Sequence, residues 1–265
     1  PKPLIEDELW AHIEPLLPKK RRRKRYTGRK PLDDRRALTG ILFVLRSGIP
    51  WERLPKEMGC GSGMTCWRRL RDWQRCGAWR RLHRVLLSEL RGAKRLGFSR
   101  AVADSSSFAR QALEKKWTEP TDRRRPASKH LLLLTGAQGI PLSLILTGAN
   151  RHDVTQLLPL LVAIPPVAGL PGAPKRKPAL IQADCAYHSE PLRQRLQDRA
   201  STPRSPGAAP RAAAAWANRW VVERTIAWLH QFRRLRVKYE RLPLMHEAFL
   251  MLGACIICWR SVKAA

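Results

Sequence analysis

Residues 130–148 read HLLLLTGAQGIPLSLILTG, in which two apolar runs flank a short turn that contains glycine. The runs His130 to Thr135 and Ile140 to Thr147 have the length and the residue types of β-strands. Gly136 to Gly139 separate them and supply the turn. The stretch therefore predicts a β-hairpin in the middle of the chain.

Strands and helices alternate around this hairpin. Ala101 to Ala103 is a short apolar run that ends on Asp104, and Ala179 to Ala183 is a strand that ends on Asp184. Helical spacing predicts four further helices, at 153–163, 189–198, 220–237 and 245–259. Strands mixed with helices over residues 98–265 indicate an α/β or α+β body.

The first 92 residues have helical periodicity only. Pro50 to Glu57 predicts a short helix, Gly59 to Gly63 a tight turn, and Met64 to Trp73 a helix that carries Arg68, Arg69 and Arg71. A short helix, a Gly-rich turn and a basic second helix are typical of helix-turn-helix DNA readers. The alternative is an ordinary helical bundle with a solvated basic face.

The charge of the chain narrows its partners. The 265 residues include 51 Lys and Arg against 21 Asp and Glu, a net charge of +30 that is spread over both halves. Such a charge indicates a polyanion, either nucleic acid or an anionic membrane surface, and argues against an enzyme of small neutral metabolites. No run of about 18 apolar residues and no secretory signal is visible, so we expect no spanning helix and a reducing compartment.

Three acids of the body stand directly behind apolar runs, namely Asp104, Asp184 and Glu223. A carboxylate in such a place is costly unless it is paired or binds a cation, and in a basic protein it would repel DNA. Magnesium resolves both problems, because it neutralises the carboxylates and coordinates phosphate oxygen. Two Asp and one Glu fit a two-metal site for phosphodiester chemistry. Asp153 is either a fourth contributor or a helix cap.

Motifs along nearly the whole chain resemble the DDE transposases of the insertion-sequence-five group, within the insertion-sequence-four-like superfamily. The similar segments, in chain order, are GIPWERLP (48–55), GSGMTCWRRLRDW (61–73), ADSSS (103–107), PTDRRRPASKH (120–130), IPLSLILTGANRHD (140–153), TQLLPLL (155–161), ADCAYHS (183–189) and WVVERTIAWLHQFRRLRVKYER (220–241).

The resemblance implies an RNase H-like catalytic domain, a mixed central sheet flanked by helices, over 98–265, behind an all-α helix-turn-helix-type domain over 1–92. It implies that Asp104, Asp184 and Glu223 bind Mg²⁺, with Mn²⁺ as an alternative ion. Water and then a DNA 3′-hydroxyl would attack phosphodiesters. The implied partners are double-stranded DNA, as terminal inverted repeats and as target, and a second copy of the chain on DNA. A cytoplasmic location and no membrane partner are expected.

The helix around Glu223 predicts further DNA contacts. Arg219, Glu223, His230 and Arg234 fall on one helical face, so basic groups accompany the acid. The superfamily signature Tyr-x2-Arg-x3-Glu-x6-Lys lands on Trp216, Arg219, Glu223 and His230, so the Arg and the Glu match. Lys129, which lies within the PTDRRRPASKH segment, joins the expected DNA-binding residues.

Two segments depart from the family pattern. Residues 117–127 have lost the usual glycines, and 200–217 is an Ala/Pro-rich stretch where relatives carry a basic segment that contains glycine. We interpret the second departure as the product of compensating frameshifts. A non-catalytic or decayed DNA-binding protein is therefore the alternative to an active transposase.

Overall fold

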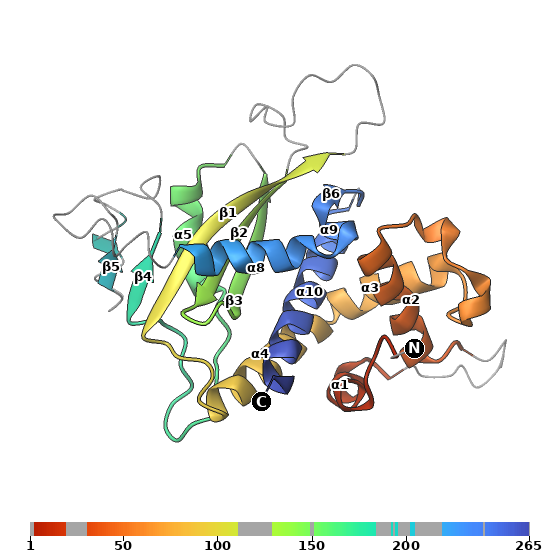
Figure 1. Ribbon diagram of the computed structural model, residues 1–265, viewed down its shortest axis with the longest axis horizontal. Helices are drawn as coiled ribbons and strands as arrows, with labels where there is room; N and C mark the ends of the chain where they lie inside the picture. Colours follow the sequence, from red (N-terminus) through yellow and green to blue (C-terminus); the bar gives the residue numbers. More distant parts are fainter. Residues whose placement is uncertain are drawn as a thin grey trace, which may run out of the picture.

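The computed structural model describes residues 3–19, 31–110, 129–148, 151–183, 192, 194–195, 202–204, 219–240 and 242–264. Helices from the start of the chain lie at one side of the molecule and a mixed sheet lies at the other, as Figure 1 shows. The long last helix, α10, runs between them. This arrangement matches the expected α/β body preceded by an all-α head.

The head is built from short helices with clear start and stop signals. Its elements are α1 (Asp7–Ile13), η1 (Glu14–Leu16), α2 (Asp34–Ser47), η2 (Trp51–Arg53), η3 (Lys56–Met58), α3 (Gly63–Arg75) and α4 (Ala78–Gly92). Asp33 caps α2 by accepting the Arg36 N–H, and Ser62 caps α3 by accepting the Thr65 N–H. The single short helix expected over 50–57 is wrong. Two 3₁₀ turns occupy this stretch, and Pro55, which has no N–H to donate, stands between them.

The sheet has the order β3-β2-β1-β4-β5, and β6 pairs with the far end of β1. Its strands are β1 (Arg100–Arg110), β2 (Lys129–Gly136), β3 (Pro141–Gly148), β4 (Leu180–Gln182), β5 (Thr202–Arg204) and β6 (Val237–Lys238). The β1–β2 and β2–β3 pairs are antiparallel, whereas β1–β4, β4–β5 and β1–β6 are parallel. The predicted hairpin is therefore confirmed as β2–β3, within a mixed sheet.

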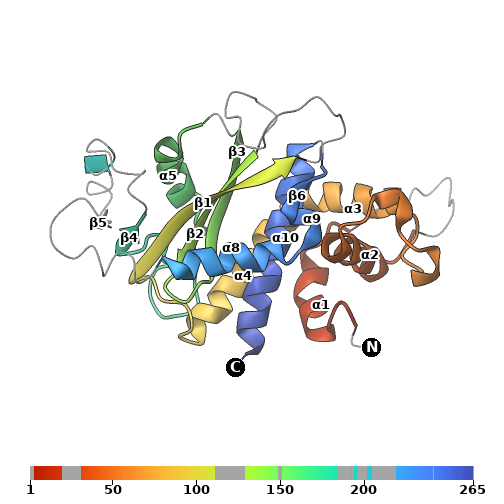
Figure 2. The same cartoon turned by 45° about the horizontal axis from the view of Figure 1, so that its top comes forward.

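Helices cover both faces of this sheet. The four leucines of β2, Leu131 to Leu134, are fully buried, as expected for a strand with packing on both sides. One face carries α5 (Asp153–Val162), and the other carries α8 (Trp220–His230) and α10 (Pro243–Lys263), as Figures 1 and 2 show. Ser143 of β3 points to the α5 face, because its hydroxyl donates to the Leu160 carbonyl.

The last helix joins the body to the head. Along α10, every residue from Ala248 to Trp259 is buried, and the helix packs against α3, α4 and β3. Its length and mean hydropathy reach those of a spanning helix, contrary to the expectation from apolar runs, but 78% of the apolar window is buried in the protein. Burial raises the pKa of the Cys255 and Cys258 thiols, so both stay protonated and pack as small apolar side chains.

One long helix expected over 220–237 is wrong. The helix ends at His230, and a separate turn, α9 (Arg233–Arg236), follows. Phe232 breaks the helix, because its backbone is extended and its side chain is buried in the core. The helix expected over 189–198 lies mostly outside the described residues. The division of the chain at residues 92 and 98 stays a prediction.

Candidate active site and nucleic-acid interface

Asp104 lies on β1 at the point where burial ends. Ala101 to Ala103 are buried, and the Asp104 side chain keeps 13% of its surface exposed. Its Oδ1 accepts the Ser105 N–H at 2.8 Å. The strand does not end at this acid, as the sequence suggested, because the serines that follow continue the ladder with β2 up to Ser107 opposite His130. Asp104 is thus held rigidly within a central strand.

Glu223 lies beside the same arginine as Asp104, although the two acids are far apart in the sequence. It lies in the first turn of α8, which packs across β1 and β2. Arg219, one helical turn earlier, has its Nε 3.3 Å from Glu223 Oε1 and 4.0 Å from Asp104 Oδ2. The Arg219 and Glu223 side chains are 31% and 57% exposed. One partly open guanidinium therefore lies beside two carboxylates that the sequence placed together on chemical grounds.

Asp153 belongs to the opposite face of the sheet. Its Oδ2 accepts the Ser105 hydroxyl at 2.8 Å. Adjacent strand residues point to opposite faces, so Ser105 points to the α5 face and Asp104 to the α8 face. Asp153 is the first residue of α5, and His152 occupies the cap position. Its carboxylate ties α5 to β1 and does not face the Asp104–Glu223 pair.

Asp184, the third expected ligand, lies outside the described residues. The described part of the chain contains no group of three His, Cys, Asp or Glu side chains placed to hold a metal ion. Asp104 and Glu223 nevertheless fit such an ion chemically. Both offer carboxylate oxygens, the donors that Mg²⁺ prefers, and both lie beside one positive charge that a cation could replace.

Two of the three arginines expected on the recognition helix lie at the surface. Arg68 is exposed on α3. Arg71 is half-buried, bonds to Asp72 at 2.9 Å and lies 5.4 Å from the ring centroid of Trp67. Lys129 begins β2, but its side chain lies outside the described part. Of the predicted DNA contacts on α3, Arg68 is therefore open to solvent and Arg71 partly so.

Arg69 lies inside the head, contrary to its expected role on DNA. Only 5% of it is exposed. Its Nη2 donates to the Leu32 carbonyl at 2.9 Å, and its Nη1 lies 2.5 Å from Asp34 Oδ1. On α3, Arg69 stands between Arg68 and Leu70, and successive residues of a helix point in different directions. Arg69 therefore fastens α3 to the start of α2 and is not available to a phosphate.

Arg234 is also buried, at 5% exposure, so the structure corrects its predicted DNA contact. Its Nε and Nη2 donate to Glu240 Oε1 at 3.0 and 2.7 Å, and its Nη1 donates to the Gly48 and Ile49 carbonyls. The Trp51 indole N–H donates to the same Glu240 oxygen at 3.3 Å. The break after His230 takes Arg234 off the helical face of Glu223. It anchors the head to the body instead.

Sequence reasoning missed this anchor, although both of its halves had been singled out. Trp51 belongs to the GIPWERLP segment and Glu240 to the end of the WVVERTIAWLHQFRRLRVKYER segment. Trp51 also stacks on Phe249 of α10, with ring centroids 5.6 Å apart. Two segments that each resemble the transposase family, from different regions of the chain, therefore meet at one buried ion pair.

His230 does not replace a signature lysine electrostatically. Burial, together with the nearby charge of Arg236, lowers the pKa of His230 below its usual value. The imidazole is therefore neutral at neutral pH and adds no positive charge to the face that carries Glu223.

The outer face of α8 holds a second feature that the sequence analysis missed. Arg224 lies between Trp220 and Trp228, with its guanidinium carbon 4.5 and 4.7 Å from their ring centroids. Its Nη2 donates to the Gln138 carbonyl in the turn of the β2–β3 hairpin. The spacing of four residues between each tryptophan and the arginine was the available signal. The stack of Trp220, Arg224 and Trp228, with the bond to Gln138, fixes α8 and therefore Glu223 against the hairpin.

Comparisons with known proteins agree with this architecture. A family described as putative transposases of the IS4/5 family matches residues 5–83, and one described as a transposase DDE domain matches residues 96–259. A putative transposase for insertion sequence element IS402 from Burkholderia cepacia is 48% identical over 167 residues, which cover 63% of this chain and 77% of that protein.

Two other similarities are more limited. An uncharacterized 16.2 kDa protein of insertion element IS402, also from Burkholderia cepacia, is 64% identical over 108 residues, which cover 40% of this chain and 74% of that protein. The similarity to a solved structure, the Mos1 transposase paired-end complex with left transposon end, covers 91% of this chain and 82% of the Mos1 chain, at 14% identity. Its TM-score of 0.27 is too low to carry an argument.

The DDE-domain match spans more than half of the chain and includes all three expected acids. It confirms the RNase H-like catalytic fold that the motifs implied, and it implies dependence on a divalent metal. The chain belongs to the DDE transposases, in the IS4-like group.

Proposed function

We propose that this transposase binds the terminal inverted repeats of an insertion sequence, cuts the DNA at them and joins the ends to target DNA. The observation that carries the proposal is the meeting of Asp104 and Glu223 beside Arg219. The two acids come from a strand and a helix far apart in the sequence. In a protein of this charge, they mark a place where a cation and DNA phosphate can be held together.

The metal is proposed to be Mg²⁺, with Mn²⁺ as a substitute, held by Asp104, Asp184 and Glu223. In the β1–β4 ladder Val102 faces Gln182, and Asp104 and Asp184 each follow two residues later in the sequence. This register supports a shared position for the two aspartates. When bound, such ions make water a stronger nucleophile and neutralise the leaving oxygen.

The chain's own groups orient the reactants. The Ser105 N–H fixes the Asp104 carboxylate, and the Arg219 guanidinium lies beside both acids. Because Arg219 is partly open to solvent, its guanidinium can pass from the carboxylates to a phosphate of the incoming DNA.

The head is proposed to read duplex DNA with α3. Arg68 is open to solvent and Arg71 partly so, on a helix that follows a glycine-containing turn, which supports a helix-turn-helix role. A homodimer on DNA is proposed because two ends must be joined. A cytoplasmic location on the bacterial chromosome, without a membrane partner, follows from a DNA substrate.

The test is cleavage of a duplex that carries the terminal repeat, with Mg²⁺ or Mn²⁺. Asp184→Asn and Glu223→Gln should each lower the rate by at least about a hundredfold. Glu57→Gln, which alters an exposed acid on η3, is the matched control. Equal rates in all four proteins would overturn the assigned site.

A second candidate function is a decayed transposase that still binds DNA. The departures at 117–127 and 200–217 favour it. Tight binding of terminal-repeat DNA without cleavage by the unmodified chain would support this reading.

A further inference from the structure

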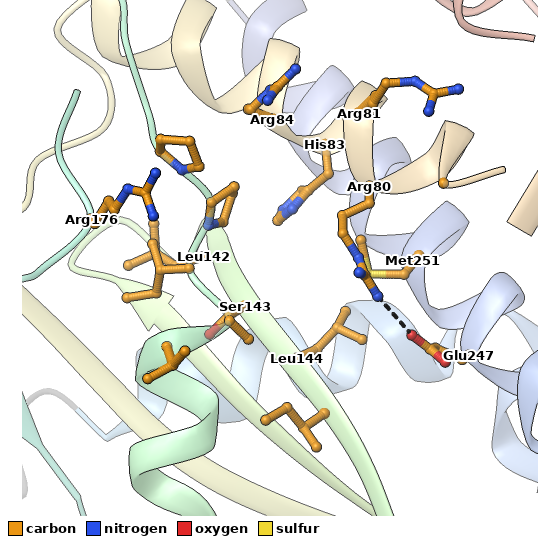
Figure 3. A pocket seen from close by; sticks show the side chains of 17 residues that line it. Arg80, Arg81, His83, Arg84, Leu142, Ser143, Leu144, Arg176, Glu247 and Met251 are labelled. Atoms are coloured by element: carbon orange, nitrogen blue, oxygen red, sulfur yellow. Dashed lines mark hydrogen bonds and ion pairs between the residues drawn. The ribbon is translucent and has the colours of Figure 1, made fainter. Parts of the chain in front are cut away.

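A pocket of about 590 Å³ lies at the β3 edge of the sheet, away from Asp104 and Glu223. Its walls come from α4, from β3, from α10 and from the segment that follows α5, as Figure 3 shows. In the sheet order, β3 is two strands from β1, so the pocket lies about 10 Å across the sheet from the strand that holds Asp104. Nothing in the proposed cleavage chemistry uses it.

The rim of the pocket is strongly basic. Arg80 and Arg84 lie one helical turn apart on α4, and Arg176 reaches the rim from the segment before β4. All three are exposed. Arg80 lies 3.5 Å from Glu247, the one carboxylate of the lining, and its side chain is 74% exposed. No hydrogen bond or ion pair engages the Arg84 and Arg176 guanidinium groups within the part of the chain that the structure describes.

The other basic groups of the lining are already committed. Arg81 donates to the Cys76 and Leu16 carbonyls, so it is part of the head. His83 is buried, its ring bonds to the Pro141 carbonyl at 2.8 Å, and burial lowers its pKa to about 4. His83 is therefore neutral at neutral pH. The charge offered to a ligand comes from the three rim arginines.

The floor is apolar and one hydrophobic side chain is left open. Leu142, Leu144 and Met251 form the inner wall, and Val162 at the edge is 66% exposed. A ligand that fits must carry negative charge toward the rim and apolar surface toward Val162. A phosphodiester strand has both, because its phosphates alternate with deoxyribose. The planar guanidinium fork suits phosphate oxygens, which bind it in pairs.

We propose that this pocket binds the sugar-phosphate backbone of duplex DNA, through Arg80, Arg84 and Arg176, independently of sequence. The proposal rests on the proposed function in that the ligand is DNA. The contact adds affinity for DNA without sequence specificity. It holds the DNA at the β3 edge of the sheet, whereas β4 lies on the other side of β1.

The test is duplex binding as a function of salt, for the full chain and for Arg84→Gln/Arg176→Gln. One random duplex and one duplex with the terminal repeat are the probes. Loss of two phosphate contacts should lower the slope of log affinity against log salt by about 2. Near 0.1 M salt the double variant should bind both duplexes more weakly by the same factor, about tenfold per arginine.

The matched control is Lys94→Asn, which removes a positive charge from the exposed turn after α4, outside the pocket. Asparagine tolerates the left-handed backbone that Lys94 adopts. A double variant that loses no more affinity per charge than this control overturns the proposal. A loss confined to the terminal-repeat duplex overturns it too, because it would show sequence readout.

Two further arms identify the occupant. If the double variant keeps duplex affinity but loses binding to phosphatidylserine vesicles, the pocket is a membrane site and the proposal fails. If it loses duplex affinity while free inorganic phosphate does not compete at millimolar concentration, an extended DNA backbone is supported. Cleavage by the unmodified chain is scored separately, so a catalytically dead protein can still pass or fail this test.

Discussion

Arg219 and Arg234 lie in one continuous stretch of sequence and both contact carboxylates, yet their surroundings are opposite. Arg219 is 31% exposed beside Asp104 and Glu223, whereas Arg234 is 5% exposed and bonds to Glu240 and to two head carbonyls. A partly solvated pair exchanges partners easily, and a buried pair does not. The same residue type therefore lies at the proposed ligand site in one place and holds two parts of the fold together in the other.

The largest effect is expected at the buried pair. Arg234→Ala would leave the Glu240 carboxylate buried without its partner and should lower the free energy of unfolding by about 3–5 kcal/mol. Urea unfolding followed by fluorescence measures this change. Arg233→Ala, at the exposed neighbouring position, should change it by no more than about 0.5 kcal/mol. Equal unfolding midpoints for the two variants would remove the contrast between buried and open arginines.

His83 extends the comparison to a buried basic side chain that bonds to a backbone carbonyl and whose effect on stability depends on pH. His83 has a folded pKa of about 4 against an ordinary value of 6.5, because burial disfavours the charged form. Its contribution is fully present above pH 6.5 and is lost as the pH falls toward 4, because only the unfolded chain takes up the proton there. The loss should be on the order of 3 kcal/mol.

The measurement is urea unfolding at pH 7, 5.5 and 4.5 for the unmodified chain and for His83→Gln. The variant should lose less stability over this interval, since it has no proton to take up at this position. Parallel pH profiles would show that His83 does not carry the acid sensitivity.

A smaller effect is expected at the backbone that receives Arg234. Gly48 has a φ of +75°, and its carbonyl accepts the Arg234 Nη1–H. Gly48→Ala places a side chain in the left-handed region, with its Cβ about 3.0 Å from the Arg233 Cβ, and should cost about 1–2 kcal/mol. Gly59→Ala, also at positive φ but with open space around it, isolates the backbone part of that cost. An equal loss in both variants would mean that contact with the 233–234 segment adds nothing.

The smallest effect on stability is expected at the open pair. Arg219→Gln should change the free energy of unfolding by less than about 1 kcal/mol, because its contacts are screened by solvent. The same variant should weaken cleavage of terminal-repeat DNA by at least tenfold, by our proposal that this guanidinium moves to phosphate. A variant that is strongly destabilised, or fully active, would make Arg219 resemble Arg234 or an ordinary surface residue.

The elements that the sequence predicted are those whose signals are local. The β2–β3 hairpin and the apolar α10 lie where periodicity and turn residues placed them. The pairing of Asp104 with Glu223 could be inferred from the unusual position of acids behind apolar runs. The side of the sheet on which each acid lies followed only from packing.

The failures share a physical cause, which is that tertiary contacts decide where a helix ends and which of its polar side chains are buried. The buried Phe232 ends α8 early, so Arg234 left the face of Glu223. Likewise, nothing in the run of arginines on α3 distinguished the buried Arg69 from the exposed Arg68. That difference depends on Leu32 and Asp34, which come from a different part of the chain.

The place of α10 at the end of the described chain bears on synthesis at the ribosome. This helix packs against α3 and α4, and its Cys255 thiol donates a hydrogen bond to the Trp79 carbonyl. The head therefore lacks part of its core until α10 has been made. A nascent chain that stops earlier would present the uncovered apolar face of α4 to chaperones and proteases. The packing of the head and that of the body are therefore completed together, once α10 has been made.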